Sequence, residues 1–113
     1  MSKKIRLTWS DIHNYKYEVN FTFFISLGDN EIEYEKSISE KDNLLDLLDT
    51  ISEIVNYEVE NDGEDWCINC VANVIAKSIE QVDSKMKKLL LDTDCIWDYH
   101  YIKGLNNNEY WQP

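Results

Sequence analysis

The residues best suited to chemistry are three cysteines and one histidine in the second half of this 113-residue chain. Cys67 and Cys70 form a C-x2-C pair, and Cys95 and His100 follow with C-x4-H spacing. Thiolate sulfur and imidazole nitrogen are the ligands of structural zinc sites. The four residues therefore define one functional alternative, a zinc-stabilised adaptor domain with a Cys3His site.

The same cysteine pair also permits a redox interpretation and a packing interpretation. We expect Asp65 to cap a helix that carries Cys67 and Cys70 near its start, where the helix dipole favours a thiolate. Glu64 and Asp65 oppose that thiolate, and free cysteine commonly packs as a small buried apolar residue. We therefore expect the pair to lie at the rim of an apolar helix face, with no metal and no cofactor.

Other catalytic arrangements have little support in the sequence. His13 and His100 have no serine or cysteine partner at a recognisable spacing. The three glycines are scattered, so the chain has no glycine-rich phosphate loop. We expect structural roles for both histidines and a protein that is not an enzyme, with a small histidine-dependent enzyme as the last alternative.

Acidic residues dominate one continuous part of the chain. Residues 29–65 contain 14 aspartates and glutamates and two lysines, whereas the remaining residues contain eight acids and nine bases. Like-charge repulsion within such a segment costs stability, and an acidic surface attracts basic partners through interactions that salt weakens. We do not expect direct nucleic-acid binding, because a phosphate backbone requires clustered lysine and arginine.

Hydrophobic periodicity predicts the elements that position these residues. Alternating apolar residues predict strands at 4–10, 15–27 and 31–38, and residues 95–102, which are rich in strand formers, are the candidate for a fourth strand. Helical spacing predicts helices over about 40–60 and about 65–89, followed at the end of the chain by an irregular tail. We expect a single domain, 1–113, of the α+β class, in which two helices pack on one face of an antiparallel sheet of three to four strands, in the order βββααβ.

These elements would arrange the acids as two stripes, one on the third strand and one on the solvent side of the first helix. Acidic side chains repeat there at a spacing of about 5 to 7 Å, a scale similar to that of nucleic-acid phosphates. The aromatic pair in the polar tail is typical of a contact surface. The predicted partner-binding residues are Glu31, Glu33, Glu35, Asp46, Asp49, Glu53, Glu60, Tyr110 and Trp111.

The predicted function is therefore a non-enzymatic inhibitor that occupies a basic nucleic-acid-binding cleft of a protein, such as a nuclease effector. In size and acidity the chain is similar in type to phage anti-defence proteins, including anti-CRISPR proteins, and to immunity proteins that neutralise nuclease toxins. Plain solubility is the alternative explanation of the charge. The odd number of cysteines and the absence of a long apolar run favour a cytoplasmic protein without a membrane partner.

Overall fold

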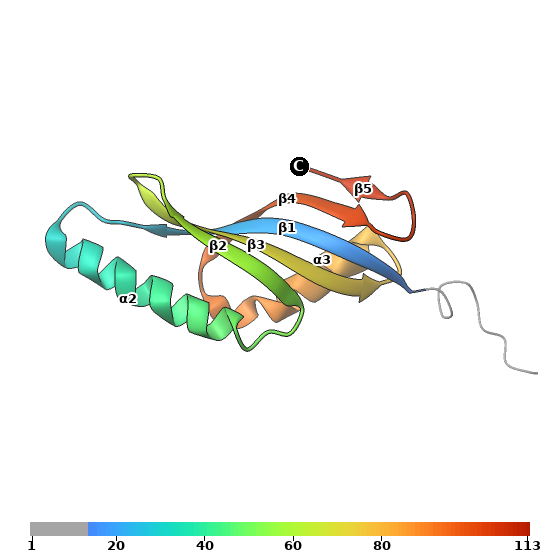
Figure 1. Ribbon diagram of the computed structural model, residues 1–113, viewed down its shortest axis with the longest axis horizontal. Helices are drawn as coiled ribbons and strands as arrows, with labels where there is room; N and C mark the ends of the chain where they lie inside the picture. The colour runs from blue at the N-terminus through green and yellow to red at the C-terminus, as the bar shows by residue number, and fades with distance from the viewer. Residues whose placement is uncertain (1–13) are drawn as a thin grey trace, which may run out of the picture.

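The computed structural model describes residues 14–113 as one antiparallel sheet of five strands with two α-helices (Figure 1). The predicted strand at 4–10 and His13 lie outside the described residues. In chain order the elements are β1 (Tyr15–Ser26), α2 (Glu31–Leu48), β2 (Ile54–Asn61), β3 (Asp65–Ala76), α3 (Ile79–Leu89), the short 3-10 helix η1 (Leu91–Thr93), β4 (Ile96–Gly104) and β5 (Tyr110–Trp111). The prediction of an α+β fold is confirmed.

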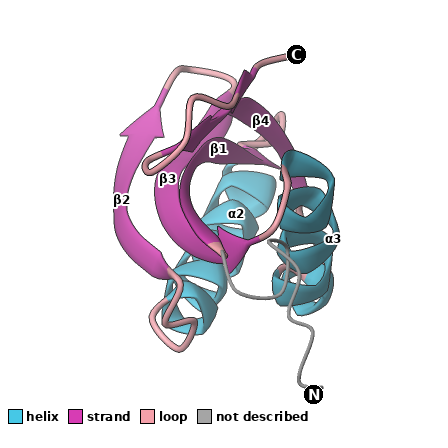
Figure 2. Ribbon diagram, turned by 90° about the vertical axis from the view of Figure 1, so that its right-hand side faces the viewer, coloured by secondary structure: helices cyan, strands magenta, loops and turns pink. Residues whose placement is uncertain are grey.

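The strand order across the sheet is β2-β3-β1-β4-β5, and all neighbouring strands are antiparallel. β1 lies in the centre because it pairs with β3 on one side and with β4 on the other. The succession βαββαβ with β1 and β3 as the central strands is the split arrangement of ferredoxin-like folds. Both helices cover the same face of the sheet, and no helix of the described residues covers the other face (Figure 2).

The order of the elements differs from the predicted βββααβ, and the first difference is α2. Residues 31–38 form its first half and not a strand. The Asn30 side chain accepts a hydrogen bond from the backbone N–H of Glu33, at 2.9 Å, and the Glu33 carboxylate accepts one from the N–H of Asp29, at 2.7 Å. This reciprocal cap, together with glutamates in the first turn, stabilises a helix start and overrides the alternating pattern.

The prediction of helices at 40–60 and 65–89 is wrong for more than half of each range. α2 ends at Leu48, and the residues expected to continue it form β2. The start of the second predicted helix is β3, and only residues 79–89 are helical, as α3. In β3 the buried residues alternate with half-buried or exposed ones from Ile68 to Ala76, so the period of two decided the structure.

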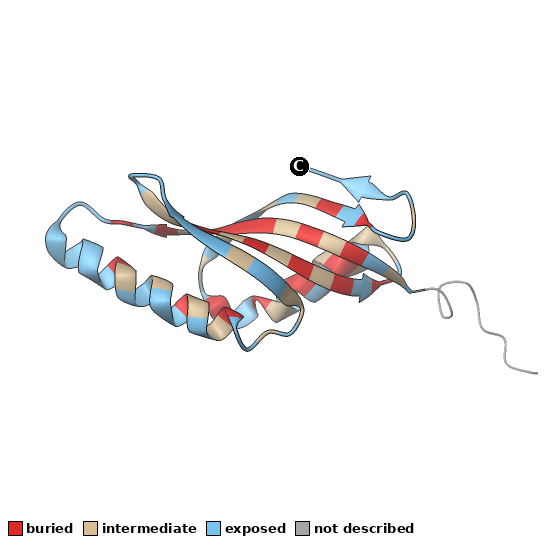
Figure 3. Ribbon diagram, in the orientation of Figure 1, coloured by how far each residue is buried: buried red, intermediate tan, exposed pale blue. Residues whose placement is uncertain are grey.

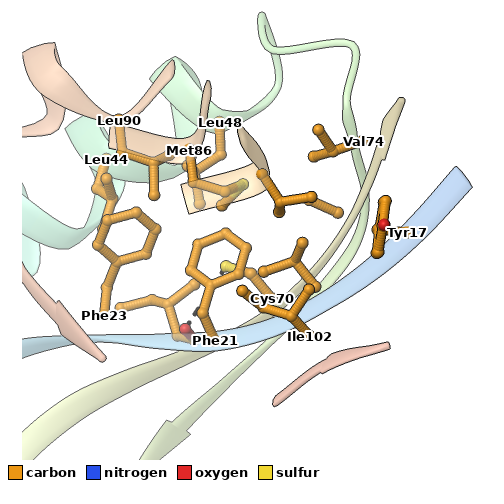
Figure 4. Packing of buried hydrophobic residues seen from close by; sticks show 14 of the residues in the cluster. Tyr17, Phe21, Phe23, Leu44, Leu48, Cys70, Val74, Met86, Leu90 and Ile102 are labelled. Atoms are coloured by element: carbon orange, nitrogen blue, oxygen red, sulfur yellow. Dashed lines mark hydrogen bonds between the residues drawn. The ribbon is translucent and has the colours of Figure 1, made fainter. Parts of the chain in front are cut away.

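The main hydrophobic core lies between the sheet and the two helices (Figures 3 and 4). Alternate residues of β1 point inward, and the rings of Phe21 and Phe23 meet edge to face with centroids 5.6 Å apart. Leu44 and Leu48 of α2 and Met86 of α3 pack over these rings. A continuous row of large buried side chains on the central strand is what allows both helices to share one face of the sheet.

The end of the chain is more ordered than an irregular tail. β4 confirms the strand predicted at 95–102, and β5 adds to its edge with Trp111 opposite Ile102. The buried Tyr17 donates a hydrogen bond from its hydroxyl to the Glu109 carboxylate, and Asn107 donates to the same hydroxyl at 3.2 Å. These contacts tie the β4–β5 connection to the central strand.

The burial pattern of α2 predicts that alanine substitution at two of its apolar residues lowers the free energy of unfolding by very different amounts. Leu48 is 1% exposed and Ile32 is 83% exposed. We expect Leu48→Ala to lower the free energy of unfolding by about 2 to 5 kcal/mol, because it leaves a cavity, and Ile32→Ala to change it by about 0.5 kcal/mol or less. Urea unfolding of both variants measures the difference. Equal losses would contradict this packing of α2.

Alanine substitution at the two glycines with positive φ should lower the free energy of unfolding by unequal amounts. Gly28 has φ +81, and a Cβ there would lie 2.3 Å from Cβ of Glu33, whereas Gly63 has φ +95 and open space. Gly63→Ala should lower the unfolding free energy by about 1 to 2 kcal/mol through backbone strain alone. Gly28→Ala should lower it further, because the added methyl group displaces the residue that caps α2. Thermal unfolding of the two variants tests this order, which an equal loss would refute.

Candidate protein-binding surface

The acidic segment of residues 29–65 folds into α2, β2, the turn that follows β2, and the first residue of β3. Two side-chain hydrogen bonds join α2 and its C-cap to the β2–β3 hairpin. Near the hairpin turn, the Trp66 indole donates to the Ser37 hydroxyl at 3.0 Å. Near the other end, the Tyr57 hydroxyl donates to the Asp49 carboxylate at 2.8 Å. The segment therefore lies toward the β2 edge of the sheet, with α2 on the covered face and β2 at the edge itself.

Five of the acidic residues share one side of α2. Their spacings of four, seven, four and three residues repeat with the turns of the helix. All five are exposed, and the buried residues Ser37, Leu44 and Leu48 lie on the opposite side. We name this set the α2 stripe, which extends over about 27 Å at 1.5 Å per residue. Its members are Glu31, Glu35, Asp42, Asp46 and Asp49.

The structure therefore brings together four of the predicted acidic residues that had been assigned to two different elements. The other three lie elsewhere. Glu33 points back to cap its own helix, and Glu53 is half-buried in the loop after α2, where its carboxylate accepts from Ser52 at 3.2 Å. Glu60 lies on β2.

Glu58 is an acidic residue of β2 that the sequence prediction omitted. It pairs with Asn69 of β3, and Glu60 pairs with Cys67, so both carboxylates project from the sheet face that the helices leave uncovered. Both are exposed. The alternation of Tyr57, Glu58, Val59 and Glu60 was the available signal, since a period of two indicates a strand.

The two aromatic residues predicted at a contact surface lie at the opposite edge of the sheet, on β5. The ring of Trp111 meets that of Tyr99 edge to face at 5.4 Å, and Tyr110 stacks on Tyr101 at 5.9 Å. Trp111 forms part of the wall of an open pocket of about 420 Å³ between α3 and β4. Tyr110 and Trp111 therefore do not share a surface with the α2 stripe.

Asp83 and Tyr99, in the wall of that pocket, bind each other, and Asp83 also binds Lys87. The Tyr99 hydroxyl donates to the Asp83 carboxylate at 2.7 Å, and Lys87 pairs with the same carboxylate at 3.0 Å. The hydrogen bond from Tyr99, followed by that from Lys87, lowers the pKa of Asp83 despite partial burial. Burial and the neighbouring carboxylate raise the pKa of Tyr99. These groups are already paired within the chain.

The predicted cysteine set is not assembled. Cys67 and Cys70 lie on β3 and not at a helix start, and residues three apart on a strand point to opposite faces. Cys70 is in the core beneath the helices (Figure 4). Cys67 is on the other face, beside Asp62. Within residues 14–113 no group of three or more potential metal ligands is present. The residues therefore do not fit the Cys3His site.

The thiols are also poorly suited to redox chemistry. Burial raises the pKa of Cys70 to about 12. Burial, followed by a hydrogen bond to Asp62, raises the pKa of Cys67 to about 11. A nucleophilic cysteine needs the opposite shift, because the thiolate is the reactive form.

His100 takes part in a small polar cluster that the sequence did not reveal. It occupies the bulge of β4, between the residues that pair with Asn20 and Phe21. Its Nε2 lies 2.6 Å from the Thr22 hydroxyl, which donates to Asn69 at 2.7 Å. The cluster joins three neighbouring strands. None of its members is a sulfur or carboxylate nucleophile.

Comparisons with known proteins give little further information. No protein-family model matches the chain, and no curated protein matches it significantly. One solved structure is similar at a TM-score of 0.46 and 9% identity, an AsnC family transcriptional regulator from Agrobacterium tumefaciens. The alignment covers 98% of this chain and 63% of that chain. In the described part of the chain, no helix combines the length and apolar character needed to cross a bilayer.

The strand placement of the cysteines predicts an order of thiol reactivity. In native protein at pH 8, iodoacetamide should modify the half-buried Cys95 before Cys67 and Cys70, because both of these are buried and their pKa values lie well above that pH. In denaturant all three should react at similar rates. Peptide mapping by mass spectrometry measures the order. Rapid native labelling of Cys67 or Cys70 would contradict the assignment and revive the redox interpretation.

Proposed function

We propose that this protein is a non-enzymatic inhibitor that binds a basic, nucleic-acid-binding surface of a protein partner. The observation that carries the proposal is the α2 stripe, five exposed carboxylates along one side of a single helix. Neither Lys36 nor Lys41 falls within the stripe by helical spacing, although Lys41 reaches Asp42 at 3.2 Å. A row of this kind presents regularly spaced negative charge, as a phosphate backbone does.

The position of the stripe on the helix argues for a role in binding. Its last members, Asp46 and Asp49, lie at the C-terminal end of α2, where the helix dipole is negative and the last turn has no basic residue. Each carboxylate there is destabilising by about 0.3 to 1 kcal/mol at low salt. The Tyr57 hydrogen bond compensates only Asp49. Solubility alone would be served as well by acids at favourable positions, so we attribute the arrangement to a partner.

Two biological settings fit a protein of this kind. A phage protein could block a nucleic-acid-binding defence effector, as anti-CRISPR proteins do, or an immunity protein could neutralise a nuclease toxin. In both settings the acidic surface would cover the basic cleft of the partner and exclude the nucleic acid. The same measurement therefore tests both settings.

The test compares three tagged proteins in pull-downs from a host lysate. The stripe variant has Glu35→Lys, Asp42→Lys and Asp46→Lys. The control variant has the same change of charge at the exposed residues Glu80, Asp92 and Asp98, none of which belongs to the stripe. We expect wild type and control to capture a nucleic-acid-binding protein that is released between about 0.1 and 1 M salt, where the Debye length falls from about 10 to 3 Å. The stripe variant should lose it.

An inhibitor of this kind must also displace nucleic acid from the partner that it captures. Added wild-type protein should displace a labelled oligonucleotide from the captured protein, and the stripe variant should not. Retention of the partner by the stripe variant, or a partner that still binds its oligonucleotide in the complex, would overturn the proposal. In that event the acidic surface would serve solubility.

A further inference from the structure

We infer that the free edge of β2 binds an extended basic segment of the partner by adding it to the sheet as a sixth strand. This inference rests on the proposed function, because it specifies how the partner of the acidic surface is held. β2 pairs with β3 on one side, and no described strand pairs with its other side. Six of its eight residues are exposed (Figure 3).

The register identifies the backbone groups that face outward. The hairpin closes with a hydrogen bond from the N–H of Asp62 to the carbonyl of Asp65, at 3.1 Å. Backbone groups of an antiparallel strand alternate between the paired neighbour and the opposite side. Counting back from Asp62, the backbone groups of Glu58 and Glu60 point toward β3, and those of Tyr57, Val59 and Asn61 point to the free edge. An added strand would find these donors and acceptors unoccupied.

The side chains along this edge favour an incoming strand of positive charge. Glu58 and Glu60 project from the uncovered face, and Asp62 and Glu64 follow in the exposed turn. Val59 is 38% exposed, and its side chain projects from the opposite, helix-covered face, where it offers an apolar contact to the alternate residues of an added strand. Lysines or arginines at alternate positions of an incoming strand would face Glu58 and Glu60, since cross-strand pairs of opposite charge are favourable.

A second copy of this chain is a poor occupant of the same edge. Two β2 strands side by side would bring the Glu58 and Glu60 carboxylates of both copies together, and like charges on adjacent strands are destabilising. The α2 stripes would add to the repulsion at a net charge of −11 per chain. Exposed edges are commonly protected by charged side chains, especially lysine, by proline or by a bulge. The bulge at Val55 protects one end of β2, and from Tyr57 to Asn61 the only charges are acidic, so they repel a second copy but not a basic segment.

The test uses two fluorescein-labelled eight-residue peptides of equal charge. The strand peptide alternates lysine with valine, and in the reference peptide two valines are proline, which removes donors and disfavours pairing. By fluorescence anisotropy at about 0.1 M salt, we expect the wild-type protein to bind the strand peptide at least tenfold more tightly. Equal affinities would overturn the inference, because they would indicate a general attraction of charge.

Variants of the protein separate the contribution of backbone pairing at the β2 edge from the contribution of charge. Val59→Pro removes an outward N–H and should abolish the preference for the strand peptide, and retention of the preference would contradict the inference. Glu58→Gln with Glu60→Gln should weaken binding more than the matched pair Glu31→Gln with Glu35→Gln on α2. If Val59→Pro fails to fold, by circular dichroism, the two-peptide comparison on wild type still decides.

Failure of strand addition can be distinguished from failure of the proposed function. If Val59→Pro still captures the salt-released partner and the α2 stripe variant does not, the proposed function stands and strand addition is wrong. If neither peptide binds and the stripe variant captures the partner normally, both are wrong.

Discussion

The pairing of β1 with both of its neighbours is the constraint on which the rest of the structure depends. Its twelve residues are in register with β3 along their full length, and most of them also pair with β4. The inward row that includes Tyr17, Phe21 and Phe23 is the floor on which both helices pack. Because the helices share that face, the opposite face and the two sheet edges are left to other roles.

The electrostatic asymmetry of the molecule follows from this layout. The chain leaves the centre of the sheet through α2, returns at the outer edge as β2, and re-enters beside β1 as β3. The acidic segment coincides with this excursion, so its carboxylates lie on the solvent side of α2 and on the uncovered face of β2, while the lysines of α3 lie on another element. An acidic helix below the sheet and an acidic free strand at its edge form the basis of the proposed contact with a basic partner.

Sequence patterns predicted the fold class and two strands well, for identifiable reasons. In β1 and β4 aromatic and β-branched residues alternate with polar residues, so only one period fits them. In β2 and β3 the apolar residues recur at spacings that satisfy both periods, and the glycine turn at Gly63 was interpreted as a helix break when it closes a hairpin. At α2 the local cap of Asn30 and Glu33 outweighed an alternation that resembled a strand.

The candidate site was predictable in composition but not in geometry. The concentration of acids was evident from the sequence, whereas their division between a helix side and a strand edge depended on the secondary structure. The same choice decided the cysteines, since a spacing of three places Cys67 and Cys70 together on a helix and apart on a strand. The contribution of β5 was not predictable, because a two-residue strand depends on its tertiary pairing with β4.

Residue-resolved amide hydrogen exchange by NMR, with and without a bound basic strand peptide, is the sharpest test of strand addition at β2. Strand addition should slow exchange at Tyr57, Val59 and Asn61, whose N–H groups face the free edge, and leave Glu58 and Glu60 nearly unchanged, because these already pair with β3. Unchanged exchange along β2, or protection confined to β5 or to the uncovered sheet face, would contradict it.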